Sequence, residues 1–315
     1  MRAVRRGRDG ALYIGLRRGD HDEPETIVIP DEDLPRPGRV TGGTICGDIQ
    51  AHDFRSEILD ESRTILVYRP PGYSDKSPWN YPVLYLFDGQ NVFDVRTAAF
   101  GVEWRLDETA EALIQARKME PILMVAVYNS PDRFDEYTPS HDPEHGGGGA
   151  DRYGAFLIRE LKPFIDRIYK TNRKASSTAL MGSSLGGLCA LYLGWKHPET
   201  FGLVAALSPS LWWAGRDLIA AIAGDPRTHG PQKVWLDMGT EESDEDRNRN
   251  QVPDVIDDVR TMKAVLLQKG YRLNEDFFYR EVQGAYHDER SWSDRVGEIL
   301  QALYPVEDVN AIRHE

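Results

Sequence analysis

A serine at the centre of a glycine-rich turn is the first feature of the sequence that could do covalent chemistry. Residues 182–186 read Gly-Ser-Ser-Leu-Gly, which is a GxSxG pattern centred on Ser184. An apolar run at 178–181 precedes the pattern, and an apolar helical segment with small residues follows it at 185–196. A serine on a sharp strand-to-helix turn needs small neighbours, because larger side chains would clash. The pattern predicts a nucleophile at Ser184, with Ser183 as the weaker candidate and a purely structural turn as the alternative.

A serine hydroxyl is a weak nucleophile and needs a base within hydrogen-bond reach. In strand–turn–helix hydrolases the partners follow the serine along the chain. Four histidines do so here: His197 ends a helical pattern, His229 lies in a Gly/Pro loop, and His314 is near the terminus. His287 comes shortly after an apolar run at 277–282. It is therefore expected at the carboxyl end of a strand, and we predict that it is the base.

The acid that orients the imidazole is expected after the apolar run at 234–238. Glu241, Glu242 and Asp244 follow that run, and their positions alone do not choose among them. Asp237 is expected inside the strand itself. The sequence therefore predicts a carboxylate partner for the histidine and leaves three candidates.

A developing oxyanion needs backbone N–H groups at the turn of the nucleophile and in a neighbouring loop. The residue after the nucleophile is Leu185, and the loop after the apolar run at 82–87 reads Asp-Gly-Gln-Asn over 88–91. We predict that Gln90 and Leu185 supply these two groups. The alternative for the Asp-Gly pair is an ordinary turn.

Strands alternating with helices must position these residues. Runs of apolar or alternating residues predict strands at 63–68, 82–87, 122–127, 178–181, 202–207, 234–238 and 277–282. Helical periodicity predicts helices at 104–116, 151–169, 185–196, 255–269 and 292–303. This order predicts an α/β fold with a mostly parallel sheet and helices on both faces, and ligands bind such sheets beyond the carboxyl ends of the strands. We predict an N-terminal extension over 1–50 with a strand at 25–29, a catalytic domain over 51–305 and a tail over 306–315.

Composition limits the function classes. The chain has 315 residues, 40% hydrophobic and 28% charged, with a formal net charge of −13. The acidic balance argues against a nucleic-acid or anionic-membrane partner, and no apolar run reaches the ~18 residues of a membrane span. The basic start lacks the apolar stretch of an export signal, so we expect a cytoplasmic protein. Cys46 and Cys189 form no CxxC pair, Cys189 is expected to be a buried thiol, and no metal or organic cofactor is expected.

Several motifs occur in one order along the chain. They are residues 85–94 (YLFDGQNVFD), 101–104 (GVEW), 136–139 (EYTP), 182–187 (GSSLGG), 208–213 (SPSLWW) and 239–242 (GTEE). Over about residues 54–304 the chain resembles the esterase-D-like branch of the α/β-hydrolases. That branch includes enterobactin-type siderophore esterases, feruloyl and acetylxylan esterases, S-formylglutathione hydrolases and mycolyltransferases.

The resemblance implies an α/β-hydrolase fold and a serine carboxylic-ester hydrolase that works through an acyl-enzyme without a cofactor. It favours Glu242 as the acid, three residues after Gly239, and Gln90 for the oxyanion hole. The family's histidine loop places an acidic residue and a tryptophan after the histidine, as Glu289 and Trp292 stand here. The spacer between its glycine, Gly284, and His287 has two residues in this chain.

The resemblance leaves the substrate open between a siderophore ester and a sugar ester. Arg133, Arg152 and Arg290 could bind an anionic siderophore, with surface salt bridges as the alternative. Trp212 and Trp213 are predicted either to line the substrate pocket or to pack in the core. An acyltransferase on the same scaffold, or a catalytically idle binding module, is the alternative function.

Two loops have a composition that invites a functional interpretation. Residues 138–150, which include four consecutive glycines, are expected to form a mobile loop beside the site, with a plain linker as the alternative. Residues 244–254 space oxygen-bearing side chains as a calcium loop does. However, Arg249 stands where such a loop has glycine, and Val255 stands where it has glutamate. We therefore expect a solvated charged loop at 244–254.

Overall fold

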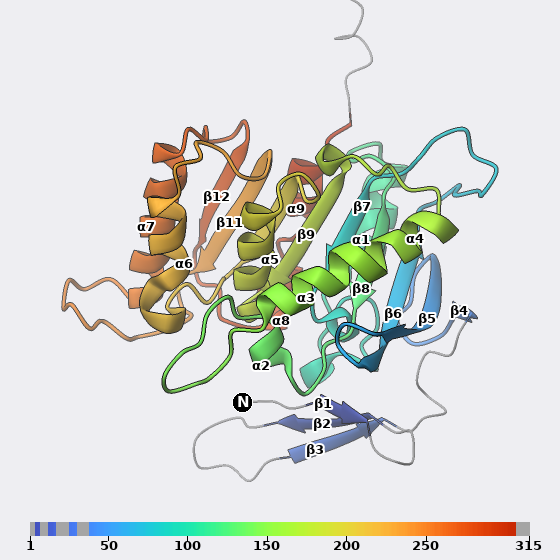
Figure 1. The fold of residues 1–315 in the computed structure, drawn as a ribbon. Helices are drawn as coiled ribbons and strands as arrows, with labels where there is room; N and C mark the ends of the chain where they lie inside the picture. The colour runs from blue at the N-terminus through green and yellow to red at the C-terminus, as the bar shows by residue number, and fades with distance from the viewer. Residues whose placement is uncertain (1–3, 7–11, 17–24, 30–37, 307–315) are drawn as a thin grey trace, which may run out of the picture.

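A nine-stranded sheet forms the centre of the molecule (Figure 1). The computed structural model describes residues 4–6, 12–16, 25–29 and 38–306. The strand order across the sheet is β12-β11-β10-β9-β7-β8-β6-β5-β4. The strands are β4 (Gly38–Val40), β5 (Asp48–Ser56), β6 (Glu61–Arg69), β7 (Val83–Leu86), β8 (Leu123–Val127), β9 (Thr178–Ser183), β10 (Leu203–Leu207), β11 (Lys233–Gly239) and β12 (Phe277–Val282).

The sheet is parallel over six neighbouring strands and antiparallel at one edge. Strands β8, β7, β9, β10, β11 and β12 pair in parallel. Strand β6 runs antiparallel to β8, and β5 and β4 continue the antiparallel edge. Because the parallel strands share one direction, the loops after them open at one edge of the sheet. Ser184, His287, Glu242 and Gln90 each follow one of these parallel strands.

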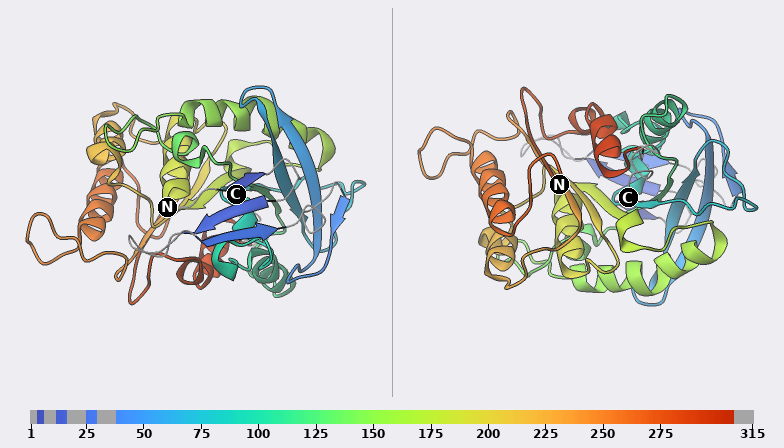
Figure 2. Two further views of the ribbon diagram at one scale, coloured as in Figure 1. Left: turned by 90° about the horizontal axis from the view of Figure 1, so that it is seen from below. Right: turned by 90° about the horizontal axis from the view of Figure 1, so that it is seen from above.

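Helices cover both faces of the sheet (Figure 2). They are α1 (Leu106–Gln115), α2 (Arg133–Glu136), α3 (Ala150–Phe156), α4 (Lys162–Ile168), α5 (Leu185–Lys196), α6 (Trp213–Gly224), α7 (Asp254–Gln268), α8 (Glu289–Ser293) and α9 (Val296–Leu303). Helices α3 to α7 pack in one hydrophobic core, and α1, α8 and α9 pack in the other. The predicted α/β-hydrolase architecture is therefore confirmed.

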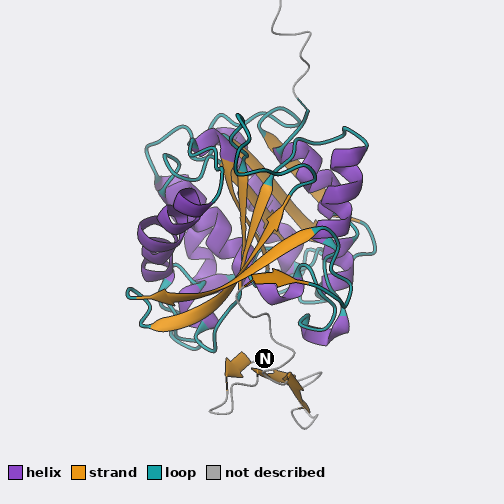
Figure 3. Cartoon of the chain, turned by 90° about the vertical axis from the view of Figure 1, so that its right-hand side faces the viewer, coloured by secondary structure: helices purple, strands orange, loops and turns teal. Residues whose placement is uncertain are grey.

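The central strands alternate between these two cores. On β7 the side chains of Val83 and Tyr85 lie in the core of α3 to α7, whereas those of Leu84 and Leu86 lie in the core of α1, α8 and α9. All four are at most 1% exposed. A strand covered on both faces needs a continuous apolar run, which explains why the sequence signal for β7 is so clear. Figure 3 shows the twisted sheet between its two helical layers.

The edge strands carry a weaker sequence signal. Strand β5 reads Asp-Ile-Gln-Ala-His-Asp-Phe-Arg-Ser and buries alternate residues over much of its length, so its polar composition hid it from prediction. It begins at Asp48, inside the range predicted as an extension. The strand predicted at 25–29 is present as β3 (Glu25–Ile29), which pairs with β2 (Leu12–Leu16), itself paired with β1 (Val4–Arg6). The proposed division into domains stays a prediction, and 307–315 lie outside the described residues.

The helix predicted over 151–169 exists with an irregularity. Helices α3 and α4 are joined by a π-helical turn over Leu157–Leu161. Helix α6 has no predicted counterpart, because residues 214–216 adopt left-handed backbone angles that interrupt a regular pattern. Among the described helices, none has the length and apolarity needed to cross a membrane.

Candidate active site

Ser184 lies on a strained turn between β9 and α5. Its backbone angles are φ 57° and ψ −123°, which residues other than glycine seldom adopt. A Cβ atom added to Gly182 would lie 2.6 Å from the carbonyl carbon of Gly186, so a side chain at 182 would clash with the backbone. The glycines are therefore needed for the turn itself. The structure supports the geometric reason for which the GxSxG pattern singled out Ser184 and not Ser183, which lies buried within β9.

His287 and Glu242 form a close pair at the ends of two neighbouring strands. Nδ1 of His287 lies 2.6 Å from Oε2 of Glu242. His287 follows β12 and Glu242 follows β11. The Glu242 side chain is 2% exposed, whereas that of His287 is 39% exposed. The carboxylate is thus held inside while the imidazole reaches the open edge of the sheet.

The other oxygen of Glu242 is also held. Its Oε1 accepts hydrogen bonds from the backbone N–H of Gly239 at 2.6 Å and from Oγ of Ser208 at 2.5 Å. Ser208 in turn accepts from Nε1 of Trp292 at 3.0 Å and from a terminal nitrogen of Arg295 at 2.7 Å. Since both oxygens are occupied, the carboxylate has a fixed orientation toward His287.

A buried cation balances the carboxylates beneath the pair. Arg295 is 6% exposed, and its terminal nitrogen lies 3.0 Å from Oδ1 of Asp237 and 3.9 Å from Oε1 of Glu242. Asp237 is fully buried inside β11, where the sequence predicted it. Burial raises the pKa of Asp237, and the charge of Arg295 opposes that rise. Arg295 therefore supplies a positive charge to a pocket that holds two buried carboxylates.

Two cavities meet at the nucleophile. One of about 560 Å³ and another of about 340 Å³ are both lined by Ser184, His287, Ser210 and Trp212. Oγ of Ser184 lies 3.3 Å from Oγ of Ser210. An ester bound with its carbonyl at Ser184 would thus have separate spaces for its acyl and alcohol parts.

The loop expected to complete an oxyanion hole lies beside Ser184. Strand β7 pairs with β9, so the turn Gly89–Asn91 after β7 is next to the turn that bears the serine. Gln90 is 2% exposed, and its Oε1 accepts a hydrogen bond from the backbone N–H of Asn129 at 3.2 Å. Gln90 and Leu185 both line the smaller cavity. Gln90 and Leu185, the two residues predicted to form the oxyanion hole, thus border the same cavity.

Arg133 also lines the smaller cavity, but its guanidinium is engaged. Its Nε and one terminal nitrogen lie 2.6 and 2.7 Å from the two oxygens of Asp88. Burial lowers the pKa of Arg133, and the nearby charge of Asp88 outweighs that effect and raises it. Arg133 thus helps to fix the loop after β7. Arg152 and Arg290, the other predicted cations, line neither cavity, and Nε of Arg152 donates to the backbone oxygen of Ile58 at 2.8 Å.

The two tandem tryptophans take different places. Trp212 is 37% exposed and lines both cavities, whereas Trp213 is 1% exposed and lines neither. Nε1 of Trp213 donates to the backbone oxygen of Ser140 at 2.8 Å. We therefore correct our expectation for Trp213, which packs in the core and holds the 138–150 loop in place. The residue is buried because consecutive side chains at this helix start point in different directions.

The larger cavity is rich in acidic groups. Glu144, Glu245, Asp254 and Asp258 line it together with Arg247. Two of these carboxylates are paired: Asp254 with Arg247 at 2.5 Å, and Asp258 with Arg216 at 2.6 Å. His145 also lines the cavity, and its ring centre lies 5.8 Å from that of Trp212. The 138–150 loop therefore borders the site, as expected.

The 244–254 loop uses its oxygens for its own backbone. Both carboxylate oxygens of Asp246 accept backbone N–H groups, from Asn250 at 3.0 Å and from Gln251 at 2.8 Å. The side chain of Asp254 is taken by Arg247. This arrangement fits the charged loop that the sequence favoured over a calcium site.

Several site residues were not singled out from the sequence. Ser208 and Ser210 follow β10 directly, so the rule that ligands bind beyond strand ends would have found them. Arg295 gave no such signal, because it lies near the start of a predicted helix where an exposed arginine is the ordinary expectation. Its partners come from two distant segments of the chain, one at Ser208 and one at Asp237 and Glu242, and only the folded structure brings them together.

Comparison with known proteins places the chain in a family. Residues 56–303 match the family described as "Putative esterase". The iron(III) enterobactin esterase of Escherichia coli K12 is 25% identical over 89% of this chain and 60% of its own length. The ferri-bacillibactin esterase BesA of Bacillus subtilis is 31% identical over 49% of this chain and 56% of its own length.

Solved structures share the fold. The BES protein from Bacillus cereus has a TM-score of 0.62 at 21% identity, covering 84% of this chain and 98% of that chain. The enterobactin esterase FES from Shigella flexneri, crystallised with enterobactin, has a TM-score of 0.63 at 21% identity and covers 96% of this chain and 66% of that chain. This chain belongs to that esterase family and is a carboxylic ester hydrolase of the enterochelin-esterase-like branch of the α/β-hydrolases.

Proposed function

We propose that the protein cleaves carboxylic esters through a Ser184–His287–Glu242 triad and an acyl-enzyme. The observation that carries the proposal is the 2.6 Å contact between His287 and the buried Glu242, next to a serine on a strained turn. Because Glu242 accepts a hydrogen bond from Nδ1–H of His287, the tautomer that leaves Nε2 free to accept a proton is stabilised.

The reaction follows from these positions. Oγ of Ser184 attacks the ester carbonyl while Nε2 of His287 takes the hydroxyl proton, and Glu242 stabilises the imidazolium. The carbonyl oxygen, now negative, accepts hydrogen bonds from the backbone N–H groups of Gln90 and Leu185. The C–O bond to the alcohol then breaks, and the imidazolium protonates the departing alkoxide. Water attacks the acyl-enzyme by the same steps and releases the acid.

The exposure of the site to solvent favours water as the molecule that accepts the acyl group. The His287 side chain is 39% exposed, and both cavities reach solvent beside it. An acyltransferase would need to keep water from the acyl-enzyme. Adding glycerol or trehalose to an ester assay tests this point. We expect free acid as the main product, and a dominant transfer product would identify an acyltransferase instead.

The two substrate classes are siderophore esters and sugar esters. The charged side chains that line the cavities favour an ester whose bound part is uncharged. The larger cavity carries more carboxylates than cations, and Arg133 in the smaller one is engaged with Asp88. A ferric tris-catecholate siderophore is strongly anionic and would be repelled, whereas a sugar ester or an iron-free siderophore would not.

A matched pair of substrates tests this preference. Iron-free enterobactin and its ferric complex contain the same ester bonds but differ in charge. We expect the iron-free ester and neutral acetylated sugars to have the higher kcat/KM, and added salt to narrow the difference by screening. A higher kcat/KM for the ferric complex at low salt would contradict the preference and leave the triad untouched.

Hydrolysis of aryl acetates and butyrates tests the proposed nucleophile. Ser184→Ala should reduce the rate to background, while the neighbouring Ser183→Ala serves as a control and should keep most of it. No hydrolysis above background by folded wild-type protein would favour the idle binding module, and equal rates above background for wild type and Ser184→Ala would exclude Ser184 as the nucleophile.

A further inference from the structure

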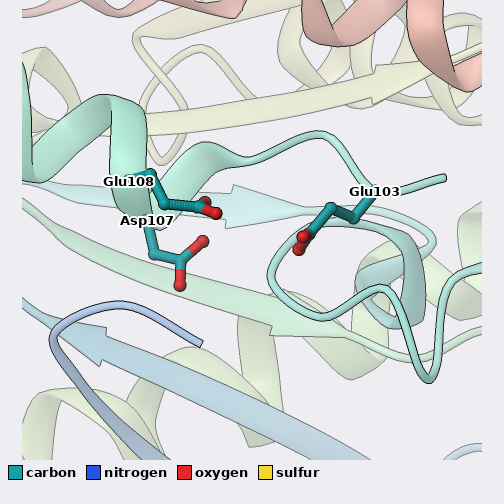
Figure 4. A group of neighbouring side chains, drawn as sticks. All are labelled: Glu103, Asp107 and Glu108. Atoms are coloured by element: carbon teal, nitrogen blue, oxygen red, sulfur yellow. The ribbon is translucent and has the colours of Figure 1, made fainter. Parts of the chain in front are cut away.

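Three carboxylates meet beside the first turn of α1, on the face of the sheet covered by α1 and α9. Figure 4 shows Asp107 and Glu108 from that turn and Glu103 from the loop before it, with their carboxylates directed toward a shared space. One oxygen from each residue lies within 4.8 Å of the others. None of the three lines either cavity at Ser184. The group is therefore separate from the proposed active site.

In each of the three residues, one buried carboxylate oxygen has no hydrogen-bond donor. Oδ2 of Asp107 accepts the backbone N–H of Cys46 at 2.7 Å, but Oδ1 accepts none. Oε2 of Glu103 and Oε2 of Glu108 are also without a partner. Asp107 is fully buried and Glu103 is 6% exposed. Native proteins seldom leave buried carboxylate oxygens unsatisfied, because burying a charge without a partner is costly.

The charge of the group is not balanced by its neighbours. Among the described residues, the cation paired with it is Arg105, whose Nε lies 3.7 Å from the other oxygen of Glu108 and whose side chain is 66% exposed. Burial, and after it the neighbouring Glu108, raises the pKa of Asp107 to about 9. Burial also raises the pKa of Glu103. The N-terminus of α1 offsets part of this cost but gives the unpartnered oxygens no donor.

We propose that Glu103, Asp107 and Glu108 bind a calcium ion. The ligand atoms are all hard oxygens, which suit calcium or magnesium and not zinc or copper. Calcium binds oxygens at about 2.3–2.6 Å, so ligands across one ion can lie roughly 5 Å apart, whereas magnesium needs about 4.2 Å or less. The three oxygens lie within 4.8 Å of one another, a spacing that one calcium ion can span. Glu108 is partly exposed, which lets water complete the coordination.

The position of the site indicates a structural role. Trp104, next to Glu103, donates its backbone N–H to the backbone oxygen of Asn91 at 2.9 Å. Its ring centre lies 5.9 Å from that of Trp292, which lies 5.0 Å from His287. An ion joining Glu103 to α1 would therefore fix the segment that follows the oxyanion loop. The inference does not depend on the proposed triad, because binding and stability report on it without any substrate.

Calorimetric titration of the chelator-treated protein with CaCl2 tests the proposal directly. We expect about one ion bound per chain and a melting temperature that rises with CaCl2. Glu103→Gln and Glu108→Gln should weaken binding by roughly tenfold or more. In chelator both variants should melt at or above the wild-type temperature, because each removes one repelling charge. Asp246→Asn, in the 244–254 loop, is the matched control and should bind like wild type.

Three outcomes would overturn the proposal. The first is no heat and no change in melting temperature with millimolar CaCl2, which would mean that a shared proton neutralises the group. The second is binding that Asp246→Asn removes and Glu108→Gln keeps. The third is a response to MgCl2 without one to CaCl2, which would reject the choice of ion. A variant that melts far below wild type in chelator is replaced by Glu108→Asp, which keeps the charge but shortens the ligand and should also bind more weakly.

Discussion

Two groups of buried carboxylates in this molecule have opposite surroundings. Glu242 lies just after β11 and Asp237 lies inside it, with Arg295, Ser208 and a backbone N–H supplying donors. Glu103 and Asp107, on α1 and the loop before it, have unpartnered oxygens facing one another. The comparison shows that burial alone does not define the role of a carboxylate. A carboxylate with fixed donors can orient a histidine, whereas converging carboxylates without donors call for a cation.

The largest effect is expected from removing the base. His287→Ala should lower kcat for aryl esters by roughly 10⁴- to 10⁶-fold, because the serine then has no group to take its proton. His229→Ala is the control, since that ring packs against Tyr271. Steady-state kinetics on both variants decides the point. A His287→Ala enzyme within tenfold of wild type would exclude His287 as the base.

The orienting acid should matter somewhat less. Glu242→Gln keeps the shape but loses the charge that stabilises the imidazolium, and we expect kcat to fall by roughly 10²- to 10⁴-fold. Glu241→Gln is the matched control and should stay near wild type. The same kcat for wild type and Glu242→Gln, with a large loss in Glu241→Gln, would reassign the acid.

Removing the buried cation Arg295 should make the folded protein less stable. Arg295→Met leaves Asp237 buried without its partner, and we expect a loss of about 3–5 kcal/mol in unfolding free energy. The direction in which this loss changes with pH follows from the pKa of Asp237. The pKa of Asp237 is already raised by burial and would rise further, so the loss should grow as pH increases above the ordinary carboxyl range.

Urea unfolding of Arg295→Met at pH 5 and pH 8 measures this loss. Arg280→Met is the control, because Arg280 pairs with Glu298 at the surface, where such pairs contribute about 1 kcal/mol or less. A loss that is equal at the two pH values would contradict the role of Asp237.

The last effect is expected at Glu103, Asp107 and Glu108, and it is a change in how stability depends on pH in the absence of metal. Without metal, Asp107 carries a pKa of about 9 in the folded protein, against about 3.9 unfolded. Because the folded pKa is raised, stability should be highest at low pH and fall as pH rises between these values. Asp107→Asn should flatten that fall in chelator. Urea midpoints at pH 6 and pH 9 test it, and an unchanged slope in the variant would contradict the account.

The sequence predicted the parallel core and the residues on its strand ends, for a physical reason. Strands buried on both faces must be apolar throughout, so β7, β8 and β10 were clear, whereas polar β5 was not. Glu242 was chosen from three carboxylates only by resemblance. Neither Arg295 nor the cluster of Glu103, Asp107 and Glu108 was foreseen. The partners of Arg295 come from segments distant in the chain, whereas the three carboxylates are close in sequence and only their burial in the folded chain sets them apart.

Intact mass after exposure to a fluorophosphonate tests the central claim most directly. Such a probe labels a serine activated by a base and leaves an ordinary hydroxyl unmodified. We predict a single adduct on wild type and on Ser183→Ala, and none on Ser184→Ala. An adduct that persists on Ser184→Ala, or folded wild-type protein without any adduct, would contradict Ser184 as the nucleophile.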